Sequence, residues 1–308
     1  MMGGLKKICS AYLFANLVIA FSVLIISAKP GSCGPPFMDF EGVGGGGIVP
    51  GAYLVNPPKD GKRIGNLAVS HWSIIGEGNE LITNGFAFSF LDRFELGYVL
   101  EINNFKRLRR ELRKISGGSM DVKRPYIYMH NLHFKVLLLK ESLYIPAFAI
   151  TAEFKYNETI ADMNDNLDEA LESVGYTDHK AIDFDFSFSK IIKDVVYYPL
   201  VINTTLRLTR GHYLGLLGFS SNYTANFEFS SALMLRPNFG IGAEIRQQND
   251  EFDPLPFENF TMKEEAFWDV FLTWLPNKHF SVAIALCRYG NVVNKDIDFF
   301  VFNAKYDF

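Results

Sequence analysis

The sequence predicts an all-β protein, a transmembrane antiparallel up-and-down β-barrel of about twelve strands behind an N-terminal signal peptide. Along many segments after Gly65, apolar and polar residues alternate, which is the period of a strand with one apolar face. Short and long connections between these segments also alternate, as turns and loops do at the two ends of an outer-membrane barrel. After the N-terminal region, no segment approaches the twenty consecutive apolar residues of a membrane-spanning helix.

The N-terminus has the residue order of a secretory signal peptide. Two lysines precede an apolar run from Ala11 to about Ala28, which ends in small residues suited to cleavage. One alternative is an uncleaved membrane anchor, because the run is near the length of a spanning helix. Another is a lipoprotein anchored at Cys33, although the three residues before Cys33 make a poor lipobox. We expect a cleaved signal peptide.

Residues 29–65 are rich in glycine and proline. The glycine run within residues 42–47 resembles a phosphate cradle, but it lacks the Gly-Lys-Ser/Thr ending and a preceding strand. We interpret it as tight backbone packing at the barrel mouth, where only glycine fits. The predicted division of the chain is therefore a signal peptide (1–28), a Gly/Pro-rich segment that is periplasmic or a plug (29–65), and the barrel (66–308).

The alternating pattern predicts an even number of strands, as bacterial single-chain barrels require. The predicted strands lie near residues 66–75, 83–91, 94–103, 126–140, 144–155, 182–191, 196–209, 222–235, 239–247, 266–275, 279–288 and 297–308.

The connections between these strands predict which end of the barrel faces the cell exterior. Turn-forming residues give tight turns at 92–93, 141–142, 193–194, 236–238 and 276–278. The longer connections are 76–82, 104–125, 156–181, 210–221, 248–265 and 289–296. Short periplasmic turns and long extracellular loops place both ends of the barrel chain in the periplasm.

The last ten residues show the clearest strand pattern. Phe300, Phe302, Ala304, Tyr306 and Phe308 alternate with a polar face. An aromatic-ended final strand is typical of the assembly signal of outer-membrane barrels. We therefore expect the barrel assembly machinery to recognise Tyr306 and Phe308. An aromatic content of 15% also suits a barrel with aromatic girdles.

Six motifs occur in order along the mature chain, at 41–50, 92–96, 206–210, 214–219, 242–247 and 274–278. Together they resemble an outer-membrane barrel family catalogued as domain of unknown function 3034. The sequence departs from the family at Gly51, where the family usually has tryptophan, and in the basic stretch 106–114. The resemblance implies a barrel in the bacterial outer membrane and implies no activity.

The polar faces of the predicted strands point into the barrel and carry charges of both signs. The predicted lumen-lining residues are Glu95, Glu101, Lys135, Glu153, Arg207, Glu228, Glu244, Arg246, Asp269, Lys305 and Asp307, with Lys155, Asp183 and Asp185 beside them. One interpretation is a water-filled, passive pore for small polar solutes. The other is a structural or surface-interaction barrel whose lumen is plugged, with its charges paired to each other and to the Gly-rich segment.

Two long loops carry charged patterns. Arg107, Arg109, Arg110 and Arg113 are candidates for contact with lipopolysaccharide phosphates, which guanidinium groups match well. The alternative for this stretch is a solvated surface helix. The acidic loop 156–181 has part of a calcium-loop spacing but lacks the required Gly and final Glu, so we expect a short acidic helix through 168–172 instead.

Nothing in the sequence indicates an enzyme, a cofactor or a metal. Its six histidines are scattered, and neither a Gly-x-Ser-x-Gly nor a His-Glu-x-x-His motif occurs. A lipid hydrolase that uses His133 or His212 with a serine and a carboxylate remains a further alternative. The net charge of −4 does not suggest a nucleic-acid partner. The expected partners are outer-membrane lipid, lipopolysaccharide and the assembly machinery, and the oligomeric state is left open.

Overall fold

The structure of the chain is a computed structural model. It describes residues 37–118, 121–122, 126–167, 169, 171–172, 175–195, 198–249, 264–291 and 296–308. The predicted signal peptide, and Cys33 with it, lies outside the described residues.

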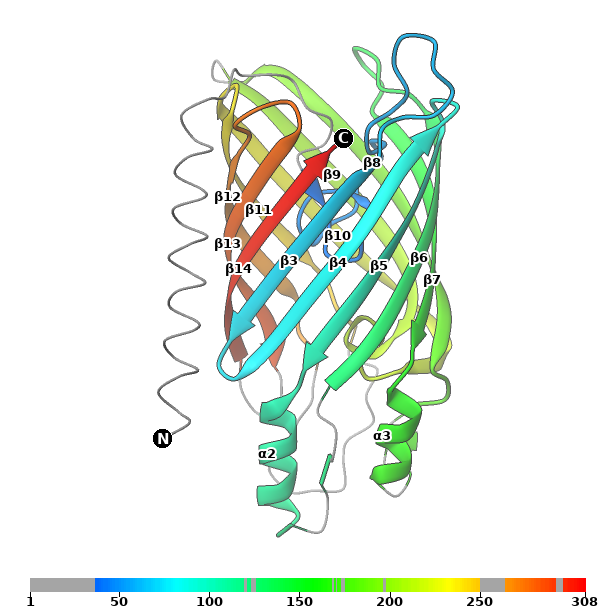
Figure 1. Cartoon of the computed structure of the whole chain (residues 1–308), viewed down its shortest axis with the longest axis vertical. Coiled ribbons are helices and arrows are strands. Elements are labelled where there is room, and N and C mark those ends of the chain that lie inside the picture. The colour runs from blue at the N-terminus through cyan, green and yellow to red at the C-terminus, as the bar shows by residue number, and fades with distance from the viewer. Residues whose placement is uncertain are drawn as a thin grey trace.

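Among the described residues, twelve strands form one closed antiparallel barrel (Figure 1). They are β3 (Ala68–Gly76), β4 (Asn79–Phe90), β5 (Phe94–Asn104), β6 (Tyr126–Leu139), β7 (Ala147–Asn157), β8 (Lys180–Val195), β9 (Tyr198–Gly211), β10 (Phe219–Arg236), β11 (Phe239–Arg246), β12 (Phe267–Trp274), β13 (Phe280–Asn291) and β14 (Asp296–Asp307). Each predicted strand overlaps one of them, which confirms the predicted fold class.

The barrel closes between its first and last strands. β14 pairs antiparallel with β3 in a continuous register from Phe300 opposite Ile75 to Asp307 opposite Ala68. Closure leaves no unpaired strand edge, which is the condition for a sheet to cross a bilayer, because lipid cannot hydrogen-bond exposed backbone groups.

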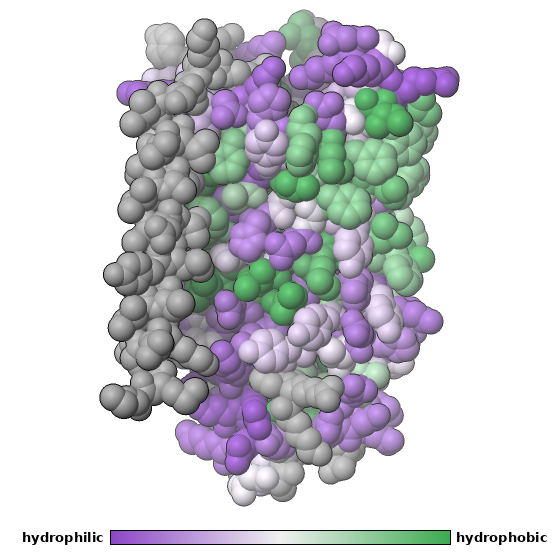
Figure 2. Space-filling model, in the orientation of Figure 1, coloured by the Kyte–Doolittle hydropathy of each residue, from purple (hydrophilic) through white to green (hydrophobic). Residues whose placement is uncertain are grey.

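The outer surface is apolar where the strands cross the membrane. Side chains such as Leu132, Phe134, Phe154 and Phe227 are more than 40% exposed on this surface, while their neighbours along each strand are buried. In Figure 2, hydrophobic residues gather on the middle of the visible face, between more hydrophilic ends. None of the described helices has the length and apolarity needed to span a membrane. A closed barrel with this outer surface belongs in the bacterial outer membrane.

Two connections differ from their predictions. The connection predicted at 76–82 is a two-residue hairpin turn at Glu77 and Gly78, with φ values of 43° and 88°. Positive φ at both positions is the geometry of a tight primed turn, and glycine adopts it without strain. The turn predicted at 193–194 was also misplaced, because β8 continues as far as Val195.

The two ends of the barrel differ, and we call them the turn end and the loop end. The turn end carries the C-terminus and the tight turns after β4 and β10, whereas α2 (Lys106–Ile115) and α3 (Ile160–Asn166) extend from the loop end, where the short turn between β3 and β4 also lies (Figure 1). By the usual rule, we expect the turn end to face the periplasm and the loop end to face the cell exterior. The helix in the acidic loop lies at α3, before the predicted position 168–172.

Loop residues close the loop end with an apolar layer. The short helix η2 (His212–Gly215) is fully buried, and Tyr213 and Leu214 adopt positive φ. They belong to one hydrophobic cluster with Leu108 and Leu112 of α2 and Met163 of α3. This end of the lumen is therefore filled by side chains from three different loops.

Inside the barrel lies a segment that precedes β3. Residues 37–55, which we call the lumen segment, contain the two-residue strands β1 (Phe37–Met38) and β2 (Gly44–Gly45). All but Tyr53 are buried. Figure 1 shows this blue segment looped within the barrel, behind β3 and β4.

Candidate functional site

Two carboxylates on the barrel wall bind backbone amides of the lumen segment. Glu95 of β5 accepts hydrogen bonds from Gly44 (3.1 Å) and Val55 (2.6 Å). Glu244 of β11 accepts from two successive amides, those of residues 47 and 48, at 2.8 and 2.6 Å. Charge-assisted hydrogen bonds of this kind are about twice as strong as neutral ones. They hold the segment from two separated strands of the wall.

Neutral and cationic side chains complete this ring of contacts. The Trp72 indole of β3 donates to the Met38 carbonyl at 3.1 Å, and the Lys135 ammonium of β6 donates to the Gly44 carbonyl at 2.8 Å. On β8, the Ser189 hydroxyl accepts from the amide of residue 52 at 2.7 Å. The lumen segment is therefore tied to strands all around the barrel rather than resting against one side.

Close packing explains the glycine run. A Cβ added at Gly46 would lie 1.7 Å from the nearest oxygen of Glu244, and one added at Gly45 would lie 2.4 Å from the amide nitrogen of Gly51. Both distances are far below any real contact, so no other residue fits these positions without displacing the segment or the wall. The run cradles a carboxylate of the same chain, and nothing indicates a phosphate site.

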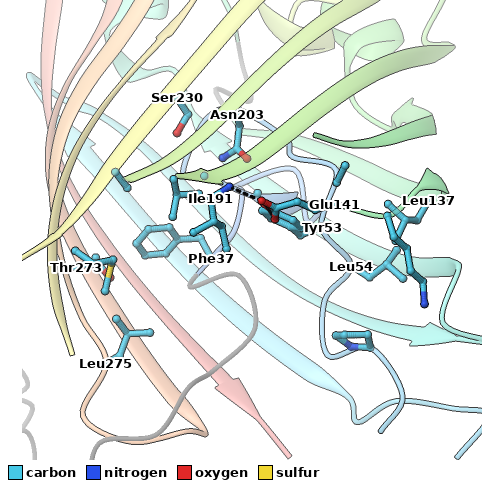
Figure 3. A pocket seen from close by; sticks show the side chains of 18 of the residues that line it. Phe37, Tyr53, Leu54, Leu137, Glu141, Ile191, Asn203, Ser230, Thr273 and Leu275 are labelled. Atoms are coloured by element: carbon cyan, nitrogen blue, oxygen red, sulfur yellow. Dashed lines mark hydrogen bonds between the residues drawn. The ribbon is translucent and has the colours of Figure 1, made fainter. Parts of the chain in front are cut away.

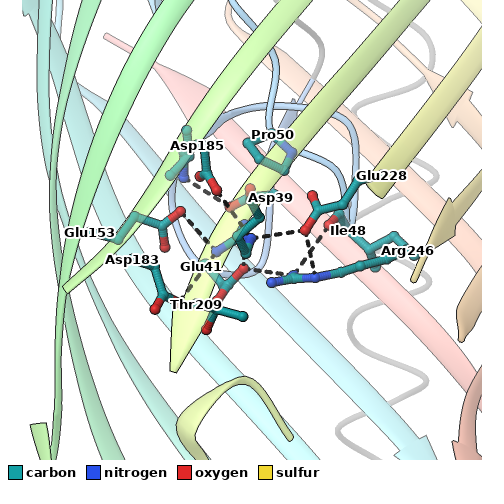
Figure 4. A network of polar contacts seen from close by, with 12 residues as sticks. Asp39, Glu41, Ile48, Pro50, Glu153, Asp183, Asp185, Thr209, Glu228 and Arg246 are labelled. Atoms are coloured by element: carbon teal, nitrogen blue, oxygen red, sulfur yellow. Dashed lines mark hydrogen bonds and ion pairs between the residues drawn. The ribbon is translucent and has the colours of Figure 1, made fainter. Parts of the chain in front are cut away.

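Glu41 of the lumen segment lies at the centre of a buried charge cluster (Figure 4). Its carboxylate pairs with Lys155 of β7, with Arg207 of β9 at 3.0 Å and with Arg246 of β11 at 2.7 Å. All four side chains have no exposed surface. One acidic residue of the segment thus pairs with three cations of the wall.

Arg207 joins most of the acidic residues of the cluster. Besides Glu41, its guanidinium reaches Glu153 at 3.1 Å, Asp185 at 3.1 Å and Glu228 at 2.8 Å. Buried ions lose their hydration, so such a cluster is stable only while its members remain paired. Removing one partner is therefore far more costly than removing an exposed charge.

The structure places all predicted lumen residues inside the barrel. The following are at most 4% exposed: Glu95, Glu101, Lys135, Glu153, Arg207, Glu228, Glu244, Arg246, Asp269, Lys305 and Asp307. They do not form one site. Lys305 and Asp307 pair with each other at 2.7 Å near the turn end, apart from the cluster around Glu41.

Glu41, the residue on which the cluster converges, is not among the predicted lumen residues, because no alternating pattern assigns residues before β3 to the lumen. One signal was available: a single acidic residue beside glycines, in a chain whose predicted lumen carries buried lysine and arginine.

The candidate arginines of α2 differ in accessibility. Arg107 is 10% exposed and bonded to Glu77 at 2.9 Å, and Arg109 forms a two-pronged contact with Asp121 at 2.8 and 3.1 Å. Arg110 and Arg113 are 68% and 57% exposed. Only the latter two extend freely enough to meet a large external anion.

The two histidines considered for a lipid hydrolase lie in different places, each beside its own glutamate. His133 contacts Glu95 at 3.2 Å and His212 lies 3.9 Å from Glu264, and both imidazoles are fully buried. No group of three His, Cys, Asp or Glu suited to a metal occurs among the described residues. Tyr306 and Phe308, the predicted assembly signal, are 43% and 58% exposed on the outer face.

Comparison with known proteins identifies the family. A family model described as "Protein of unknown function (DUF3034)" matches residues 35–298. The chain belongs to this family. The match confirms the resemblance seen in the sequence, and it spans the lumen segment as well as most of the barrel. No curated protein matches the chain.

Solved structures of outer-membrane barrels resemble this DUF3034 protein in fold. A KdgM porin has 8% identity and a TM-score of 0.47, with coverage of 78% of this chain and 99% of the porin. The COG4313 outer membrane channel from Pseudomonas putida F1 has 8% identity and a TM-score of 0.46, over 82% and 98% of the two chains. Omp33 of Acinetobacter baumannii has 10% identity and a TM-score of 0.43, over 79% and 98%.

Proposed function

We propose that this DUF3034 protein is a passive pore for small polar solutes, which its own lumen segment keeps closed in the arrangement described here. The observation that carries the proposal is that the middle of the lumen is lined by charges of the wall and occupied by residues 37–55. Glu41 of the segment pairs with three of the wall's cations, which also pair with carboxylates of the wall. When the segment leaves, these charges would face water, as in polar barrel interiors that conduct.

The charges of the wall also predict the selectivity of the vacated lumen. Around the segment, eight buried wall carboxylates stand against four buried cations: Glu95, Glu101, Glu153, Asp183, Asp185, Glu228, Glu244 and Asp269, against Lys135, Lys155, Arg207 and Arg246. An excess of acidic side chains favours cations over anions in a pore. The solutes we propose are therefore small, polar, and neutral or positively charged.

Conductance in a planar bilayer tests this proposal. We expect the folded full chain to be almost silent, and a variant lacking residues 37–55 to show stepwise currents with a preference for potassium over chloride. The charge excess gives the sign of the preference. As a control for folding, both proteins should show the same heat-sensitive migration in gels.

A structural barrel without transport is the competing function, and the apolar layer at the loop end favours it. Tyr213, Leu216 and Leu108 would still fill that end after the lumen segment is removed. If the variant lacking residues 37–55 folds and remains silent at all voltages, the pore proposal fails and the structural function takes its place.

We further propose that the protein is not an enzyme. His133 and His212 are both fully buried, where a membrane lipid cannot reach them. We expect no release of fatty acid from phospholipid vesicles by the folded barrel. Release that is lost on changing His133 or His212 to Gln would overturn this view.

We also propose that α2 contacts lipopolysaccharide through the exposed guanidinium groups of Arg110 and Arg113, because Arg matches phosphate geometry. Changing Arg110 and Arg113 to serine should weaken retention of the barrel on immobilised lipopolysaccharide several-fold at low salt. A matched control changes Lys62 and Arg63, two exposed cations near the turn end. Equal retention of both variants and the unmodified barrel would remove the idea.

A further inference from the structure

A cavity of about 530 Å³ lies between the lumen segment and the wall at the turn end (Figure 3). Phe37 and Tyr53 of the lumen segment border it, and its lining reaches the turns near Asp92 and Pro237. Its residues come from six strands of the wall as well as from the segment. The position at the turn end opens the cavity toward the periplasm rather than toward the cell exterior.

The wall of this cavity is apolar, whereas the middle of the lumen is polar. Ile191, Val201, Ala232, Met234, Phe271 and Leu275 all line it. One inward position deeper along β8, β9 and β10, the side chains are Ser189, Asn203 and Ser230. The change from polar to apolar lining thus occurs on three adjacent strands at the same depth. Folding does not require such an apolar wall around a space left unfilled.

The charges at the rim are already paired. Glu141, in the turn after β6, accepts hydrogen bonds from the Tyr53 hydroxyl at 2.5 Å and the Ile191 amide at 3.0 Å, and it pairs with Lys190 at 3.1 Å. Partial burial acts to raise the pKa of Glu141, but these hydrogen bonds lower it below its usual value. Lys140 is likewise paired with Asp92. The rim therefore offers no unpaired charge to a charged ligand.

We propose that this cavity is a binding site for an uncharged, apolar small molecule that enters from the periplasmic end. Its volume falls within the range of about 300–1,000 Å³ typical of small-molecule pockets, and such pockets are mostly apolar with a few polar groups. Asn203, Ser230 and Thr273 supply those polar groups at the edge of the apolar surface. The site lies at the turn end, and the lumen segment separates it from the loop end. Binding there therefore does not require solute to pass through the barrel.

Binding of a fluorescent apolar probe, 1-aminoanthracene, tests the proposal. The full chain is reconstituted in lipid nanodiscs and titrated with the probe, whose uptake into lipid is linear while binding to a site saturates. Ala232→Trp places a ring in the cavity, and Ala243→Trp places the same ring on the lipid face of the neighbouring strand. Ala243 lies beside Ser231 in the register and is exposed, so it is a matched control.

We expect a saturable component in the unmodified protein and in Ala243→Trp, and at least a tenfold loss of that component in Ala232→Trp. A second variant, Val201→Phe, covers the case in which Ala232→Trp does not fold. It adds a smaller ring to the same cavity and should also weaken binding. The proposal is overturned if the unmodified protein shows only linear uptake, or if folded cavity-filling variants bind the probe as the control does. Conductance is a separate readout, so this result does not depend on the pore.

Discussion

Replacing Arg207 with methionine will lower the free energy of unfolding of the barrel by about 3–5 kcal/mol, the cost of breaking a buried ion pair. Methionine has a similar length but no charge, so the loss leaves Glu153, Asp185 and Glu228 crowded together without their shared cation. Urea unfolding in lipid vesicles, followed by tryptophan fluorescence, measures the change.

Arg110 provides the comparison for this experiment. It is 68% exposed and pairs with its neighbour Glu111 at 3.3 Å. Exposed pairs contribute little to stability, so Arg110→Met should leave the urea midpoint almost unchanged. Equal midpoints for the two variants would mean that the cluster around Arg207 does not stabilise the barrel.

Changing Gly46 to valine will displace the lumen segment from its place on the wall. The added side chain would overlap Glu244, whose carboxylate also binds the amides of residues 47 and 48. We expect Ala52→Cys in this background to react at least tenfold faster with a water-soluble thiol reagent, because residue 52 is fully buried in the intact barrel.

Gly61→Ala serves as the control for this displacement. Gly61 adopts a φ of +75°, so alanine there strains the backbone, but no atom lies within 4 Å of the added Cβ. Labelling at residue 52 should stay slow. If the cysteine at residue 52 reacts as slowly in the Gly46→Val background as in the Gly61→Ala background, the glycine run is not needed to hold the segment against the wall.

The barrel could be predicted from sequence because each strand carries its own signal. Alternation on β9, for example, places Thr205 and Arg207 on one face and Leu206 and Leu208 on the other, independently of the rest of the chain. The error at 76–82 fell where one residue decides the geometry. Gly78 permits a two-residue turn, and a pattern of apolar residues does not reveal that.

The contents of the lumen could not be predicted in the same way. Glu41 meets Lys155 and Arg246 across 114 and 205 residues of chain, and no local period links such positions. The apolar cavity was not predicted either, although Val201 and Met234 are apolar residues at positions where the strand pattern places polar, inward-facing side chains. Those exceptions were visible in the sequence, but their meaning depends on strands that meet only in the closed barrel.

A disulfide crosslink tests most directly whether the lumen segment occupies the barrel. The amide of Ala52 lies 2.7 Å from the Ser189 hydroxyl, whereas Phe188 on the same strand is 43% exposed on the outer face. In a background without native cysteines, oxidised membranes should crosslink Ala52→Cys with Ser189→Cys and should not crosslink Ala52→Cys with Phe188→Cys. Absence of the first crosslink in folded protein, or equal formation of both, would contradict a segment held inside the lumen.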